Sequence, residues 1–178
     1  MAKAYLGLGS NLGNREKNLK DCIKKIKTLK GIKLLSASRF YETEPAGGPP
    51  QPKYLNAAIA IETHLSPRNL LKRLQEVESS SGRLRDVKWG ARTLDIDILL
   101  YDNQIVTDDD LIIPHIMMHE RLFVLKPLCE IAANVKHPIL NKTITKLMYD
   151  IKNIKGACPI HPYPNPSPTA MKGRRGEG

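Results

Sequence analysis

Hydrophobic and polar residues alternate in four stretches of the first hundred residues, and segments with helical spacing separate them. A period of two is typical of strands, whereas apolar residues three or four apart are typical of amphipathic helices. Leu19 and Ile26, for example, lie at helical spacing among lysines. Asn14 and Ser66-Pro67 precede the two helical segments as typical helix starts. We expect strands at residues 3–9, 32–42, 54–64 and 93–101, and helices at 15–30 and 67–80.

The order of these elements is strand, helix, strand, strand, helix, strand. It matches the ferredoxin-like βαββαβ arrangement, an antiparallel sheet backed by two helices. A turn and a short strand pair follow within residues 103–127, and residues 121–134 and 141–150 have helical spacing. We therefore expect one α+β domain over residues 1–155 with C-terminal helical additions. Residues 156–178 are rich in proline and basic residues, so we expect a mobile tail there.

Two aspartates, Asp95 and Asp97, alternate with aliphatic residues in the last of these strands. Because successive side chains of a strand point to opposite faces, both carboxylates should lie on one face. Adjacent carboxylates repel unless a cation lies between them, and oxygen ligands favour a hard ion such as Mg²⁺ that also binds phosphate. Cations for phosphate charge lie just upstream, at Arg83, Arg85, Lys88 and Arg92. The stretch predicts a metal–phosphate site, although the tripeptide alone would fit a solvated edge strand.

Composition narrows the classes of protein without identifying a ligand. The chain carries 28 Lys+Arg against 18 Asp+Glu, and its net charge of +10 attracts polyanions in general. Aromatic residues make up 5% of the chain, which disfavours an RNA-binding sheet, the main non-enzymatic alternative. The sequence contains neither paired cysteines, nor a secretory leader pattern, nor an apolar run long enough to span a membrane. We expect a cytoplasmic protein without a membrane partner.

Other motifs argue against common nucleotide and zinc sites. Residues 7–13 lie between a strand and a helix, but Leu12 occupies a position where the dinucleotide motif G-x-G-x-x-G needs glycine. The chain has no Walker sequence G-x-x-x-x-G-K-[ST]. His115 and His119 have the spacing of zinc ligands on a helix, but Pro114 disfavours a helix there.

Residues suited to a flat heterocycle accompany the acidic strand. Tyr54 and Asn56 are two apart in a predicted strand and share a face, where a ring can stack and an amide can form paired hydrogen bonds. Trp89, the single tryptophan, lies between the arginines and the aspartates. Together these residues outline a pocket for two substrates, one phosphorylated and one planar.

Five ordered blocks of sequence resemble the 6-hydroxymethyl-7,8-dihydropterin pyrophosphokinase family. The resemblance runs from Tyr5 to about Ala132. Its blocks are Leu6-Gly-Leu-Gly-Ser-Asn-Leu-Gly13, Tyr41-Glu-Thr-Glu-Pro45, Gln51-Pro-Lys-Tyr-Leu-Asn-Ala-Ala58, Gly82-Arg-Leu-Arg85 and Trp89-Gly-Ala-Arg-Thr-Leu-Asp-Ile-Asp97, followed by Pro114-His115, Arg121 and Phe123. The resemblance implies the ferredoxin-like fold and the transfer of pyrophosphate from ATP to a pterin hydroxymethyl group, with release of AMP, in folate biosynthesis.

The resemblance also implies roles for individual residues. Asp95 and Asp97 would bind two Mg²⁺ ions between the triphosphate and the attacking hydroxyl, and Arg83 and Arg92 would stabilise transition-state charge. ATP and phosphate contacts are expected from Gln75, Glu78, Arg85, Lys88, Ile98, Ile112, Ile113, His115 and Arg121. Pterin contacts are expected from Thr43, Ala46, Tyr54, Asn56, Trp89 and Phe123.

The chain departs from the family pattern at several places, among them a loop between Arg85 and Trp89 that is about one residue shorter, and Glu44 in place of a small residue or proline. Ile116 stands where a tyrosine often follows the histidine, and Asp110 stands where a basic residue can occur, which would weaken nucleotide binding. We expect a monomer that acts on small molecules and binds no nucleic acid. The enzymatic alternative is a nucleotidyl transferase with the same pair of aspartates, which would attack the α-phosphate and release pyrophosphate in place of AMP.

Overall fold

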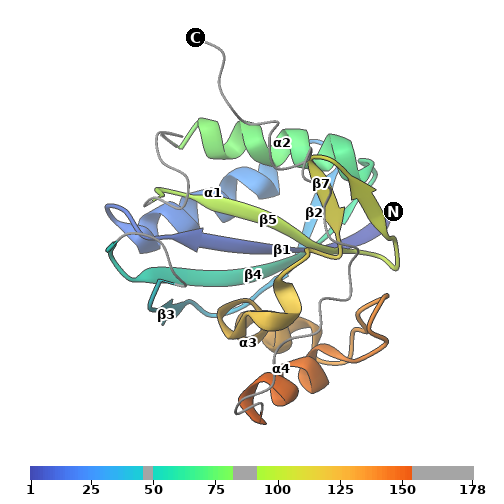
Figure 1. Cartoon of the computed structure of the whole chain (residues 1–178). Coiled ribbons are helices and arrows are strands. Elements are labelled where there is room, and N and C mark those ends of the chain that lie inside the picture. Colours follow the sequence, from blue (N-terminus) through green and yellow to red (C-terminus); the bar gives the residue numbers. More distant parts are fainter. Residues whose placement is uncertain (46–49, 82–91, 154–178) are drawn as a thin grey trace.

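A five-stranded antiparallel sheet lies between two layers of helices (Figure 1). The computed structural model describes residues 1–45, 50–81 and 92–153. The sheet contains β1 (Ala2–Ser10), β2 (Ile32–Ala37), β3 (Tyr41–Thr43), β4 (Tyr54–Thr63) and β5 (Asp95–Tyr101). Its helices are α1 (Arg15–Thr28), α2 (Pro67–Ser79), α3 (Leu122–Ala132) and α4 (Ile144–Asn153), and the remaining elements are β6 (Val106–Asp108), β7 (Leu111–Ile113) and the 3₁₀ helix η1 (Met118–Glu120).

The strand order β2-β4-β1-β5 is that of the predicted ferredoxin-like sheet, with β1 at its centre. β1 pairs antiparallel with β4 on one side and with β5 on the other. The expected fold class is therefore confirmed, and both helical additions follow the sheet. The expected mobile tail lies outside the described residues. Of the helices in the described ranges, none is both long and apolar enough to cross a membrane.

The helices begin where the sequence predicts. The Asn14 side chain accepts a hydrogen bond from the Lys17 backbone N–H, and Ser66 accepts one from Asn69 before Pro67 opens α2. Each cap satisfies a backbone donor that has no partner within its helix. Gly31, with a φ of 84°, turns the chain after α1 into β2.

The single strand predicted for residues 32–42 is wrong in detail, because β2 and β3 are separate strands along β4. Ser38 causes the interruption. Its backbone N–H donates to the Ala58 carbonyl, while its Oγ accepts from the Ala58 N–H at 2.9 Å. A side-chain oxygen thus takes the place of a backbone carbonyl as the acceptor. The regular pairing with β4 stops after Ala37 and resumes at Tyr41.

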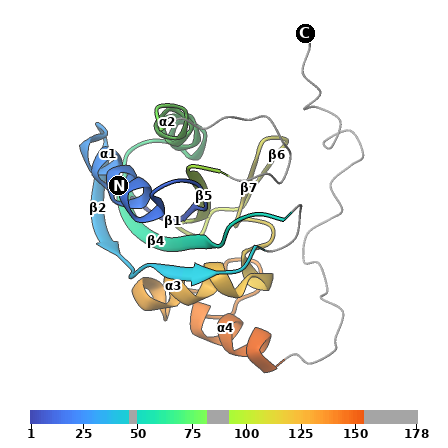
Figure 2. The same ribbon diagram turned by 90° about the vertical axis from the view of Figure 1, so that its left-hand side faces the viewer.

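Helices lie against both faces of the sheet (Figure 2), and apolar side chains are buried on each face. Leu6, Ile59 and Ile96 belong to the core that the sheet forms with α1 and α2, whereas Tyr5 and Ala60 belong to the core that it forms with α3 and α4. The β1–β5 pairing has a register shift between Tyr5 and Leu6, which is typical of a β-bulge. The shift changes which helical layer the side chains of β5 face. The helices α3 and α4 therefore cover a face that would otherwise expose apolar residues.

His137 is a buried polar residue in this second layer. Its Nδ1 accepts hydrogen bonds from the backbone N–H groups of Ile139 and Leu140, and its ring meets that of His119 edge-on at 6.1 Å. Burial, and to a lesser extent His119, lower the pKa of His137 from 6.5 to about 4. The folded protein therefore keeps this imidazole neutral where an unfolded chain would protonate it.

Lowering the pH from 6.5 to 4 should destabilise the wild-type protein more than a His137→Asn variant. Unfolding takes up a proton at His137 in this range, so each pH unit removes up to about 1.4 kcal/mol from the free energy of unfolding. The contribution is complete above pH 6.5 and is lost as the pH falls toward 4. Asparagine keeps an acceptor for the two N–H groups but does not titrate. Urea unfolding at several pH values measures the difference, and parallel curves for the two proteins would contradict it.

Candidate active site

A cavity of about 400 Å³ opens on the sheet face that carries α3, next to the start of that helix. Strands β1, β4 and β5 form its floor, and β3 and the segment from residue 115 into α3 form its sides. Its polar and aromatic lining includes the side chains of Thr43, Gln51, Tyr54, Asn56, Arg92, Asp95, Asp97, His115, Arg121 and Phe123. Strands far apart in the sequence thus bring acidic, basic and aromatic groups together.

Two glycines of the central strand β1, Gly7 and Gly9, line the cavity floor without a side chain and so leave it open. Gly9 pairs with Asn56 of β4 on one side and with Asp95 of β5 on the other. A Cβ atom on Gly9 would lie 3.4 Å from the Asn56 Oδ1 atom. Gly7 similarly faces Asp97 across the β1–β5 ladder. Neighbouring strands are about 4.8 Å apart, so Asn56 and Asp95 project from strands roughly 10 Å apart with an open strip between them.

Asp95 and Asp97 line the same cavity, as the alternation along β5 predicts. Their side chains are 27% and 45% exposed. Asp95 accepts a 2.8 Å hydrogen bond from the Arg92 guanidinium. Asp97 is open only to the cavity, and the protein atoms that surround it there desolvate its carboxylate; this desolvation and the neighbouring Asp95 charge raise the pKa of Asp97, although His115 and two arginines oppose the shift. The charge of Asp97 is therefore incompletely compensated by the protein, which favours binding of a cation here.

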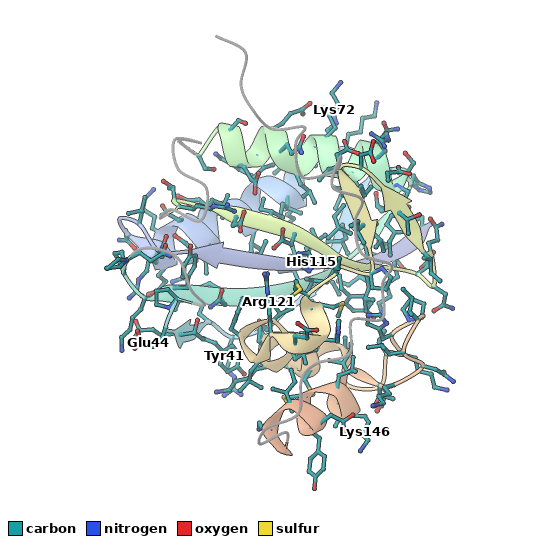
Figure 3. The ribbon with its side chains drawn as sticks, in the orientation of Figure 1. Tyr41, Glu44, Lys72, His115, Arg121 and Lys146 are labelled. Atoms are coloured by element: carbon teal, nitrogen blue, oxygen red, sulfur yellow. The ribbon has the colours of Figure 1, made fainter. Side chains whose placement is uncertain are left out.

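His115 and Arg121, both labelled in Figure 3, line the same cavity from the segment that leads into α3. The His115 backbone N–H donates to the Leu99 carbonyl of β5, and its Nδ1 accepts from the Met117 N–H. Its Nε2 lies 4.0 Å from the Asp97 carboxylate. Burial lowers the pKa of His115, which favours the neutral ring with its proton on Nε2. This ring can donate a hydrogen bond into the cavity, next to the Arg121 cation.

The other end of the cavity is suited to a flat polar ring. Asn56 is buried, and its Nδ2 donates a 2.7 Å hydrogen bond to the Thr43 hydroxyl. Tyr54 lies beside it on the same face of β4 and donates to the Gln51 side chain at 3.3 Å. Phe123 supplies a second ring from the start of α3. Aromatic groups and an amide are therefore close together, as the pattern of β4 predicts.

Five residues predicted to contact ATP lie outside the lining of this cavity as the described residues form it: Gln75, Glu78, Ile98, Ile112 and Ile113. Glu78 is buried at the end of α2, and its Oε1 accepts the Ile96 backbone N–H at 2.8 Å. This places its carboxylate at the free edge of the strand that carries Asp95 and Asp97. The hydrogen bond from Ile96 to Glu78 stabilises β5. The nucleotide contacts expected of all five residues stay predictions.

The remaining predicted residues, Ala46, Arg83, Arg85, Lys88 and Trp89, lie outside the described residues. Asp110 is described and pairs, together with Asp108, with Arg68 of α2. The Arg68 guanidinium thus compensates the negative charge of Asp110.

Asn11 is a site residue that sequence reasoning missed. It is buried, and its Oδ1 accepts the Arg92 backbone N–H at 2.6 Å. Its Nδ2 donates to the Gln51 side chain at 2.9 Å and to the Pro52 carbonyl at 3.2 Å. The amide therefore joins the aromatic end of the cavity to the arginine end. Its position in the turn after a strand with alternating glycines was the signal available in the sequence.

Comparisons with known proteins show the family of the chain. The family model described as 7,8-dihydro-6-hydroxymethylpterin-pyrophosphokinase matches residues 5–133. A Haemophilus influenzae protein named 2-amino-4-hydroxy-6-hydroxymethyldihydropteridine pyrophosphokinase is 46% identical over 148 residues, which cover 83% of this chain and 92% of that protein. A Bacillus subtilis protein of the same name is 43% identical over 133 residues, 75% of this chain and 80% of that protein.

More distant matches show the same domain within longer proteins. The folic acid synthesis protein fol1 of Pneumocystis carinii is 41% identical over 155 residues, and the match covers 84% of this chain but 21% of that protein. A crystal structure of an HPPK-DHPS protein in complex with substrates has a TM-score of 0.67 at 14% identity, covering 84% of this chain and 43% of that one. At that identity the likeness shows the fold. From its sequence blocks and the family match over residues 5–133, the chain belongs to the 7,8-dihydro-6-hydroxymethylpterin pyrophosphokinase family.

Proposed function

We propose that this protein transfers pyrophosphate from ATP to the hydroxymethyl group of 6-hydroxymethyl-7,8-dihydropterin in folate biosynthesis. The observation that carries the proposal is the cross-strand row Asn56–Gly9–Asp95, which puts a site for a planar ring beside an acidic, arginine-flanked site. In the reaction the pterin hydroxyl oxygen bonds to the β-phosphorus of ATP and loses its proton. The bond between the β-phosphorus and the bridging oxygen to the α-phosphorus breaks, and AMP leaves.

Asp95 and Asp97 fit the binding of Mg²⁺, and two ions are expected. Within the described ranges, no group of three or more His, Cys, Asp or Glu side chains is arranged to hold a metal ion. Two carboxylates with an open cavity above them suit a hard cation whose shell water and phosphate oxygens complete. When bound, Mg²⁺ would neutralise phosphate charge and orient the triphosphate.

Basic residues would hold the phosphates against this acidic pair. Arg92 and Arg121 line the cavity, and neutral His115 can donate from Nε2. Cationic donors placed around a phosphoryl group stabilise the charge that spreads over its oxygens during transfer. Arg83, Arg85 and Lys88 would add to them from the segment before Arg92.

The pterin would occupy the aromatic end. Asn56 and Thr43 would pair with its polar edge, and Tyr54 and Phe123 would flank its ring. This orientation directs the hydroxymethyl group toward Asp95 and Asp97 and makes the attack effectively intramolecular. We expect a cytoplasmic monomer that acts on these two small molecules, with neither nucleic acid nor membrane as a partner.

Purified protein with MgATP should release AMP only when 6-hydroxymethyl-7,8-dihydropterin is present. The matched control is 6-methyl-7,8-dihydropterin, which keeps the ring but lacks the attacking hydroxyl and should yield no AMP. Chromatography of the nucleotide and pterin products measures the outcome. Pyrophosphate release in place of AMP would instead establish the nucleotidyl transferase reaction.

Replacing Asp97 by asparagine should lower kcat at least 100-fold without destabilising the protein in the absence of metal. The amide keeps the shape of the carboxylate but removes a metal ligand, and it also removes the repulsion by Asp95 that raises the pKa of Asp97. Steady-state assays and thermal melts measure the two effects, with Asp21→Asn on the exposed face of α1 as the control. An activity above a tenth of wild type, equivalent to only ~1.4 kcal/mol of barrier, would exclude Asp97 as an essential ligand.

Asn56→Ala should raise the KM for the pterin and leave the affinity for MgATP unchanged. Without the Asn56 amide, the polar edge of the bound pterin lacks a hydrogen-bond partner. This loss costs about 1–3 kcal/mol of binding free energy, which corresponds to a roughly 5- to 150-fold rise in KM. Isothermal titration with each substrate separates the two affinities. Asn69→Ala, on the exposed face of α2, is the control. Equal weakening of both substrates would refute a specific pterin contact.

A further inference from the structure

Two side chains behind the cavity converge on one carbonyl oxygen just before β5. Ser10 is fully buried, and its hydroxyl donates a 2.6 Å hydrogen bond to the Thr93 carbonyl. Asn18, in the first turns of α1, donates from Nδ2 to the same carbonyl at 3.3 Å and to Ser10 Oγ at 3.2 Å. Its Nδ2 also reaches the Leu12 carbonyl at 2.9 Å. Ser10 and Asn18 therefore form a polar clamp on the segment that precedes Asp95.

The clamp acts where the β1–β5 ladder ends. The last pair of that ladder is Gly9 with Asp95, so Thr93 has no regular strand partner. Its carbonyl is paired through side chains, and the chain regains a backbone contact at Arg92, whose carbonyl accepts the Asn11 N–H at 3.0 Å. The path from Arg92 to Asp95 is thus set partly by two hydrogen-bonding side chains.

This path determines where the Arg92 guanidinium lies. Arg92 reaches forward three residues along the chain to Asp95, with a separation of 2.8 Å between Nη1 and Oδ1. The reach depends on the direction in which the backbone leaves residue 92. Ser10 and Asn18 contribute nothing to the cavity lining, because Ser10 projects from the opposite face of β1 to Gly7 and Gly9.

We propose that Ser10 and Asn18 are positioning residues for the transfer reaction, which hold the Arg92 guanidinium in line with the phosphates by clamping the Thr93 carbonyl. The inference rests on the proposed function and on the role of Arg92 in it. Binding of ATP involves many contacts, whereas the alignment of one cation matters most as charge develops in the transition state. Loss of the clamp should therefore lower kcat more than it weakens nucleotide binding.

The test compares Ser10→Ala and Asn18→Leu with the wild-type protein. Each variant should lower kcat roughly 10- to 100-fold, because small displacements of a catalytic group are costly. The dissociation constant for MgATP, from isothermal titration, should change less than threefold. If Ser10→Ala fails to fold, Asn18→Leu decides alone, because it lies at a half-buried helical position and leaves the Ser10–Thr93 hydrogen bond in place.

Asn14→Ala is the matched control in the same turn. Asn14 caps α1 through the Lys17 N–H, so its loss should lower the melting temperature while kcat stays within twofold of wild type. The decisive readout is a double-mutant cycle. In an Arg92→Ala background, Ser10→Ala should lower kcat less than twofold further, since the group through which it acts is gone.

Three results would overturn the inference. One is a kcat for both clamp variants within twofold of wild type. Another is an undiminished effect of Ser10→Ala in the Arg92→Ala background, which would show that the clamp acts by another route. The third is a wild-type protein that releases no AMP with the pterin present, which would remove the proposed function as well. An active wild type with unaffected variants overturns the inference alone.

Discussion

The antiparallel pairing of β1 with both β4 and β5 is the constraint on which the rest of the site depends. It places Gly9 between Asn56 and Asp95, residues that are far apart in the sequence. Glycine on the central strand leaves a strip of open floor between a group suited to a heterocycle and a group suited to a cation. A slip of one residue in either ladder would turn Asn56 or Asp95 to the opposite face of the sheet.

The protein compensates the charges of Asp95 and Asp97 unequally. Asp95 is held by Arg92, whereas Asp97 remains under the influence of burial and of the Asp95 charge. Such strain is typical of a site that is completed by a ligand, because bound cations and phosphates supply the charges that the protein lacks. The buried Glu78 carboxylate stabilises β5 by accepting the Ile96 N–H, a backbone donor at the edge of the sheet that β1 does not pair.

The C-terminal additions also shape the site. Helices α3 and α4 bury the second face of the sheet, and the segment that leads into α3 carries His115, Arg121 and Phe123 to the cavity wall. This segment is fixed to β5 through the His115 N–H and the Leu99 carbonyl. The packing that buries apolar surface therefore also fixes the distance from His115 and Arg121 to the two aspartates.

The alternation in β4 and β5 determined by itself that Tyr54 shares a face with Asn56, and Asp95 with Asp97, because strand geometry fixes the direction of successive side chains. The spacing of apolar residues along the chain likewise determined the element order and the fold class, and Asn14 and Ser66-Pro67 determined where two helices begin. Tertiary structure decided the interruption between β2 and β3 at Ser38 and the position of Glu78 at the edge of β5. Each depends on a hydrogen bond to a residue distant in sequence. Hydrogen bonds across the sheet are not periodic in the sequence, so local patterns cannot specify them.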